Sequence, residues 1–142
     1  MCGTPVGTDA FIRQFMTVQI QKYDPLHERT RSMEDTQAQH LALRHATCCN
    51  LNHWLRTVPP DLMKVHAQTY DRETLLTMMH MLGMEGEDAN GLTAEEILQC
   101  RIHVRLGGLG LTSAEAVMEA AWTGSWALCE GLVAFQRTHQ FY

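Results

Sequence analysis

The sequence predicts a mainly α-helical protein: a single domain of about five helices with one short extended segment before a glycine turn. Three observations lead to this prediction. Apolar residues recur at helical spacing over most of the chain, and Thr, Asp and Pro residues stand where helices begin. Residues 101–106 alternate strictly between basic and apolar side chains, which is typical of a short extended segment. The chain has 142 residues, of which 45% are hydrophobic, so it is long and apolar enough to bury a core.

The first two predicted helices have clear start signals. Thr8 or Asp9 can cap the first helix, whose apolar residues follow the helical period. Pro25 is expected to weaken or end it, because proline lacks an amide hydrogen. A second helix is predicted over residues 36–56, with Asp35 as its cap and two consecutive prolines after it.

The next two helices are marked at both ends. Pro60 suits the first turn of a third helix, which is predicted to run to about Leu82 and to stop at Gly83. Thr93, with a glutamate three residues later, forms a capping box that opens a short helix ending near Cys100.

The last predicted helix follows a turn rich in glycine. Residues 101–106 alternate basic and apolar side chains and are expected to be extended and half-buried. The glycine turn, residues 107–110, comes next. Thr112 can then cap a helix over residues 113–135, and Glu115 can complete a capping box.

A turn of this kind before a helix can present free amides and a positive helix end to a phosphate. Three side chains of the preceding segment could add contacts to the phosphate backbone of a nucleic acid. The candidate residues are Arg101, His103, Arg105, Gly107, Gly108, Gly110, Thr112 and Ser113. The alternative is a solvated edge beside a tight packing turn, which physical reasoning alone favours. The spacing matches neither a dinucleotide-binding fingerprint nor a P-loop.

Charge and motifs narrow the function classes. The net charge is −5, from 11 basic and 16 acidic residues, which argues against a stand-alone nucleic-acid binder but leaves room for a local basic patch. No nucleophile motif is present, and no cofactor is expected. His45, Cys49 and His53 could share a helix face and hold zinc, but ordinary helix residues are the favoured interpretation. The acidic residues of 85–96 are expected to form a solvated loop and a helix start.

The remaining composition indicates an intracellular protein in a reducing compartment. Five cysteines, an odd number without paired spacing, favour free thiols over a disulfide framework. The start of the chain lacks the features of a signal peptide, and no apolar run is long enough for a membrane span. The nine methionines are expected mainly in the core.

The tryptophans of the last predicted helix are candidates for a partner interface. Trp122 and Trp126 are four residues apart and share a helix face, and Met118 extends that face by one turn. Core packing or a protein interface is favoured over stacking on nucleic-acid bases.

Three blocks in order resemble the end of the palm and the thumb of non-LTR retrotransposon reverse transcriptases. The first is Cys2–Ile12, with the sequence Cys-Gly-Thr-Pro-Val-Gly-Thr-Asp-Ala-Phe-Ile. The second is Leu43–Pro60, which ends in Arg-Thr-Val-Pro-Pro. The third is Arg105–Ala114, Arg-Leu-Gly-Gly-Leu-Gly-Leu-Thr-Ser-Ala, followed by a helix that contains Gly-Ser-Trp-Ala.

This resemblance implies a helical region that grips a primer–template duplex in the family. It does not imply polymerase activity, because the family's paired catalytic aspartates lie upstream and this chain has no Asp-Asp pair. Carried over from the family, the backbone-contacting positions are Arg105, the segment 107–113 and, more weakly, Arg56.

The sequence therefore predicts a non-catalytic helical module, derived from a retroelement, that acts as a structural or interaction subunit with protein partners in a larger assembly. The alternative is a nucleic-acid-binding thumb fragment that contacts the primer–template backbone. An enzyme is not expected, since no nucleophile, base or metal set can be assigned.

Overall fold

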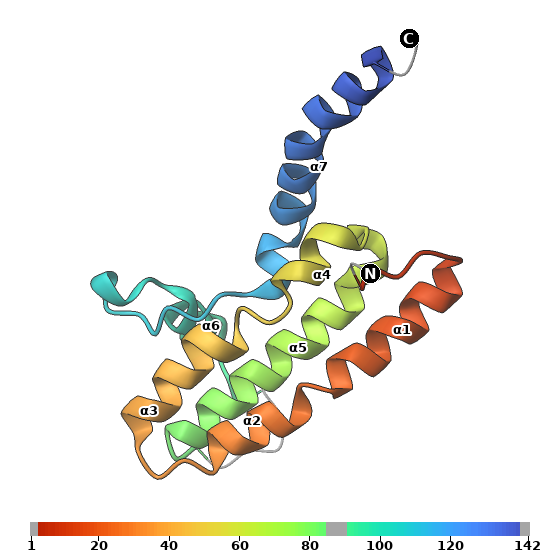
Figure 1. Ribbon diagram of the computed structural model, residues 1–142. Helices are drawn as coiled ribbons and strands as arrows, with labels where there is room; N and C mark the ends of the chain where they lie inside the picture. Colours follow the sequence, from red (N-terminus) through yellow and green to blue (C-terminus); the bar gives the residue numbers. More distant parts are fainter. Residues whose placement is uncertain (1–2, 85–90, 140–142) are drawn as a thin grey trace.

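The computed structural model describes residues 3–84 and 91–139, which form a mainly helical structure (Figure 1). No strand occurs within these two ranges, so the predicted fold class is confirmed. The α-helices are α1 (Asp9–Gln21), α2 (Asp24–Arg31), α3 (Thr36–Leu41), α4 (Asn52–Thr57), α5 (Pro60–Met81), α6 (Ala94–Arg101) and α7 (Ala114–His139). A π-helical segment, Ala42–Thr47, and a 3-10 turn, Val104–Leu106, complete the described elements.

Most of the predicted helix starts are confirmed. The Thr8 hydroxyl accepts an amide hydrogen of the first turn of α1 at 3.4 Å, and Asp35 does the same for α3 at 2.8 Å. The capping box of Thr93 opens α6. Pro25 lies in the first turn of α2, where its missing amide costs nothing, so it starts a new helix after α1 has ended.

The single helix predicted over residues 36–56 is wrong, because the chain divides there into α3, the π-helical segment and α4. At the end of the π-helical segment, Cys48 donates its amide hydrogen to the carbonyl five residues before it, at 3.0 Å. The buried hydroxyl of Tyr70 then donates to the carbonyl of Thr47 at 2.7 Å. The same carbonyl accepts the amide hydrogen of Asn50 at 3.1 Å, so a tight turn and a tertiary hydrogen bond replace the bond that a continuous α-helix would form there.

Helix α5 is the central element of the fold. In Figure 1 it lies between α1 and α2 on one side and α3 on the other. Its first half packs with α1, α4 and the start of α7 around one core cluster, and its second half packs with the π-helical segment and α6 around another. Five methionines lie buried in these clusters, as expected: Met16, Met63, Met78, Met79 and Met118.

A small polar network joins α2 to α5. The buried His27 places Nδ1 3.0 Å from the hydroxyl oxygen of Thr77, which also accepts from Arg31 Nε at 3.1 Å. Thr77 donates its own hydrogen to a backbone carbonyl, so Nδ1 of the histidine carries the hydrogen in this network. Arg31 in turn forms an ion pair with Glu73 at 3.3 Å.

Helix α7 begins in the core and then leaves it. Ala114 and Met118 are buried against α4 and α5, but no later residue of α7 whose side chain is described is buried. Figure 1 shows the helix projecting away from the other helices after its first turns. We call residues 122–139 the outer part of α7. None of the described helices is both long enough and apolar enough to cross a membrane.

Candidate interaction sites

The glycine turn is folded back against the end of α6. Backbone angles are extended at Ile102 and His103, and the chain then enters the 3-10 turn at residues 104–106. The extended segment predicted over residues 101–106 is therefore shorter than predicted. The alternation of basic and apolar residues there reflects side-chain exposure and not a strand.

The amide hydrogens of the glycine turn are used within the protein. Six consecutive amides, from residue 106 to residue 111, donate to carbonyls of residues 99–104 at 2.8 to 3.4 Å. A phosphate-binding turn needs such amides free and directed at the ligand. The amides of Gly107, Gly108 and Gly110 therefore do not form the predicted phosphate site.

Backbone conformation and close packing account for the glycines. Gly107 and Gly110 have φ angles of +85° and +68°, which glycine adopts without steric cost. A Cβ on Gly108 would lie 2.0 Å from the carbonyl oxygen of Ile102. A Cβ on Gly110 would lie 3.0 Å from Nε of Arg44. These contacts support the alternative interpretation, a tight turn required for packing.

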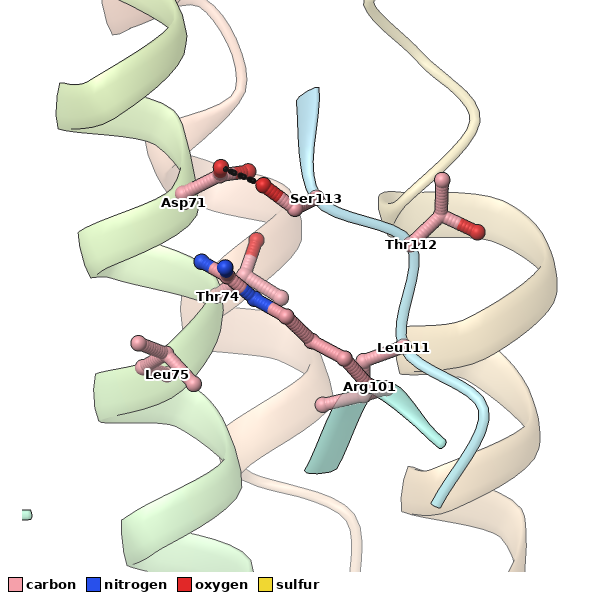
Figure 2. Close-up of a pocket in the computed structure, with 7 residues that line it drawn as sticks. All are labelled: Asp71, Thr74, Leu75, Arg101, Leu111, Thr112 and Ser113. Atoms are coloured by element: carbon pink, nitrogen blue, oxygen red, sulfur yellow. Dashed lines mark hydrogen bonds between the residues drawn. The ribbon is translucent and has the colours of Figure 1, made fainter. Parts of the chain in front are cut away.

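An internal carboxylate occupies the N-terminus of α7 (Figure 2). Asp71, in the middle of α5, is only 9% exposed. Its two oxygens accept the amide hydrogens of Ala114 at 2.7 Å and Glu115 at 3.2 Å, and the hydroxyl of Ser113 at 2.5 Å. The positive end of a helix attracts an anion, and here the chain supplies that anion itself.

The cap of α7 is Ser113 and not, as predicted, Thr112. The Ser113 hydroxyl oxygen accepts the amide hydrogen of Ala116 at 3.1 Å, whereas Thr112 is exposed. The predicted capping box does not form, because Glu115 accepts from Gln68 at 2.7 Å. The buried Ser113 is thus committed to the cap and to Asp71, and it is not available to a phosphate.

The cavity beside this cap is too small for a phosphate. Its volume is about 10 Å³, close to what one water molecule needs. The wall includes the buried hydroxyl of Thr74, which has no hydrogen-bond partner among the described residues. Figure 2 shows Arg101 extending along this wall from α6 toward α5.

Three exposed basic residues remain near the turn. Arg101, His103 and Arg105 all lie at the surface, and the ion pair found among the described residues involves none of them. The ring of His103 accepts the amide hydrogen of Arg105 at 3.2 Å. Arg56 is not brought together with this group, since it lies on α4 beside the middle of α7.

Two open grooves follow α7 where it leaves the other helices. The larger, of about 650 Å³, is lined by Arg56, Ala120, Ala121, Gly124, Ser125, Ala127, Leu128 and Cys129. The smaller, of about 270 Å³, is lined by Thr4, Arg56, Thr57, Trp122, Ser125, Trp126 and Cys129. Arg56 lines both grooves and is the one charged residue among the described residues that line them.

The apolar side chains around these grooves are unusually open to solvent. Trp126 is 59% exposed and Leu128 is 82% exposed. The rings of Trp122 and Trp126 meet edge to face at 5.6 Å, which confirms that they share a helix face. Met118, which the sequence also assigned to a partner interface, is 4% exposed and packs in the core, so this assignment is wrong.

The four described cysteines comprise two buried and two exposed thiols. Burial raises the pKa of Cys48 to about 11, and burial also raises the pKa of Cys100, so both are protonated and poorly nucleophilic at neutral pH. Cys49 and Cys129 are exposed, and all four are free thiols.

The local structure does not support the zinc alternative considered for His45, Cys49 and His53. His45 lies in the π-helical segment, Cys49 in the turn after it and His53 in α4, so they do not share one helix face. Within the described part of the chain, no three His, Cys, Asp or Glu side chains come together as a metal site. The acidic residues at 85–90 lie outside the described residues, and Glu96 serves the capping box of α6.

Comparisons with protein-family models, curated proteins and solved structures each returned no match.

Proposed function

We propose that this chain is a non-catalytic helical module that takes part in a larger assembly by binding another protein along the outer part of α7. The observation that carries this proposal is the exposure of Trp126 and Leu128 on a helix that has left its own core. Large apolar side chains grouped beside grooves are typical of protein-binding surfaces.

The energetics of α7 also support a partner. The outer part contains Gly124 and Gly131, and nothing lies within 4 Å of where a Cβ would be at either position. Each glycine inside an exposed helix costs about 1 kcal/mol relative to alanine. Most of the stability of helices in proteins comes from tertiary packing, and no described side chain in the outer part of α7 is buried. A protein packed along it would supply the missing stabilisation.

We infer that the module descends from the thumb of a non-LTR retrotransposon reverse transcriptase, on the three ordered sequence blocks given above. Nucleic-acid binding is the alternative function. What favours it is that Arg101 and Arg105 are exposed and form none of the ion pairs found among the described residues. The glycine turn adds no amide donors to such a contact, and the net charge of −5 opposes it.

The proposal is tested by site-specific photo-crosslinking in cells that naturally contain the chain. A photoreactive amino acid replaces Trp126 in one variant and Val65 on α5 in the control, since both side chains are 59% exposed. We expect a discrete heavier adduct from position 126 and none from position 65. Equal labelling at both positions, or no adduct at position 126, would contradict the proposal.

A further inference from the structure

Arg56 is positioned to determine which chemical groups a segment bound along α7 must carry. It lies near the end of α4 and lines both grooves, and the other described residues that line them are uncharged. The ion pair found among the described residues leaves Arg56 out. Arg56 is thus an isolated cation set between the exposed tryptophan and the small residues of α7.

Covering these grooves would remove water from Arg56. A guanidinium that loses its hydration without gaining a partner carries a large desolvation penalty, which would oppose any purely apolar occupant. An occupant that supplies a carboxylate removes this penalty and can bind the planar guanidinium through two hydrogen bonds. The charge pattern therefore calls for one acidic group in an otherwise apolar surface.

The shape of the larger groove suits a helix. Ala120, Gly124 and Ala127 line it and leave the backbone of α7 open to close approach. Leu128 and Trp126 stand beside them as apolar contacts. An amphipathic helix that lies in such a groove presents its apolar residues at spacings of three and four.

Resting on the function proposed above, we propose that the partner segment is an amphipathic helix with an Asp or Glu within its apolar face. The carboxylate pairs with Arg56, and the apolar residues pack on Trp126 and Leu128. A nucleic acid is a poorer fit to the same grooves, because phosphate backbones are held by several cations and the described lining residues include one.

Selection from a displayed library of helical peptides tests this. The peptides carry an apolar stripe in which one central position is randomised, and they are selected on the wild type, Arg56→Gln and Arg56→Glu. On the wild type we expect Asp and Glu to be enriched over Lys and Arg by roughly tenfold or more, in line with close charge pairs in interfaces. Arg56→Gln should remove the preference, and Arg56→Glu should reverse it.

Matched variants separate the outcomes. Lys64→Glu, which makes the same change in net charge on the exposed face of α5, should keep the acidic preference. If no peptide binds the wild type better than it binds Trp126→Ala, the proposed function itself fails. If peptides bind with no acidic preference, or with one that Arg56→Glu leaves unchanged, only the carboxylate inference is overturned. A single-stranded oligonucleotide that binds the wild type and not Arg56→Glu would overturn it in favour of nucleic acid.

Discussion

The glycine turn and the outer part of α7 are neighbours in the chain, yet they keep very different groups free. In the turn, six consecutive amides and the positive end of α7 are satisfied by carbonyls and by Asp71. Along the outer part of α7, Trp126 and Leu128 remain exposed. A binding motif in a sequence is therefore best judged by whether its groups remain unpaired after folding.

The largest effect on stability is expected at Asp71, where the N-terminus of α7 is already satisfied within the protein. Asp71→Ala would remove one carboxylate from two amides and a hydroxyl, and leave these donors unpaired at a buried position. Each unsatisfied buried donor costs about 1 to 3 kcal/mol, so the free energy of unfolding should fall by roughly 3 kcal/mol or more. Urea unfolding followed by circular dichroism measures it.

A substitution on the exposed outer part of α7 provides the control for this variant. Trp126→Ala should change the free energy of unfolding by no more than about 0.5 kcal/mol, as is usual for surface substitutions. An equal fall in the free energy of unfolding for Asp71→Ala and Trp126→Ala would mean that the outer part of α7 is covered in solution. The contrast between the two regions would then be wrong.

A second test concerns the close packing of the turn. Gly108→Ala would place a Cβ 2.0 Å from a backbone carbonyl oxygen, which cannot move as a side chain could. Overpacking of this kind typically costs about 1 to 3 kcal/mol, and the rigid neighbour favours the upper part of that range. Thermal unfolding measures the loss. An unchanged midpoint would show that the turn is looser than its hydrogen bonds indicate.

The sequence predicts a structural feature correctly where the residues that determine it lie close together in the chain. The caps Thr8, Asp35 and Thr93 are read correctly, because a cap bonds to amides only two or three residues away. The cap of α7 is misread because the deciding partner, Asp71, lies 42 residues before Ser113. A signal for Asp71 was present, since it stands in the apolar stripe of α5, where a carboxylate needs buried donors.

The candidate sites follow the same rule. The shared face of Trp122 and Trp126 is predictable from their spacing on one helix. The place of Arg56 beside them is not, because it depends on how α4 packs against α7. Met118 shares the face but lies closer to the core, and spacing alone does not say where a helix leaves its core.

Acid should lower the free energy of unfolding through two histidines, His27 and His66. Burial, and then the positive charge of Arg31, lower the pKa of His27 from its usual 6.5. Burial and Arg13 lower the pKa of His66 in the same way. The unfolded chain then binds more protons than the folded one as the pH falls below 6.5, so stability is complete above this pH and declines below it.

Urea titrations at a series of pH values measure this dependence. Above about pH 5 the carboxylates remain ionised, so the decline between that value and 6.5 reports mainly on histidines. His27→Gln should lower stability at neutral pH but flatten the decline. A variant whose decline is as steep as that of the wild type would show that His27 is hydrated in the folded state.

A smaller, stabilising effect is expected from a substitution in the outer part of α7. Gly124→Ala adds a Cβ with nothing within 4 Å, at an exposed position of the helix. Alanine should stabilise the helix by about 1 kcal/mol, seen as higher helix content and slower amide exchange in the outer part of α7. Destabilisation would indicate that this face is already covered, for example in a dimer.

The smallest change in stability is expected at Arg105, and its value lies in what it says about nucleic acid. Arg105→Ala should leave the free energy of unfolding within about 0.5 kcal/mol of the wild type, because the side chain is exposed and takes no part in the ion pair described above. Filter binding to a DNA duplex at low salt is the informative measurement. With few cations and no free amides at the turn, we expect little binding and little change on substitution.

A working thumb would behave differently, since each phosphate neutralised steepens the salt dependence of log K by about 0.9. If duplex binding is strong, salt-dependent and reduced by Arg105→Ala but not by Arg56→Gln, the cationic segment beside the closed turn is the functional surface. The exposed face of α7 would then be secondary. The two variants therefore decide between the regions, because each removes one cation from only one of them.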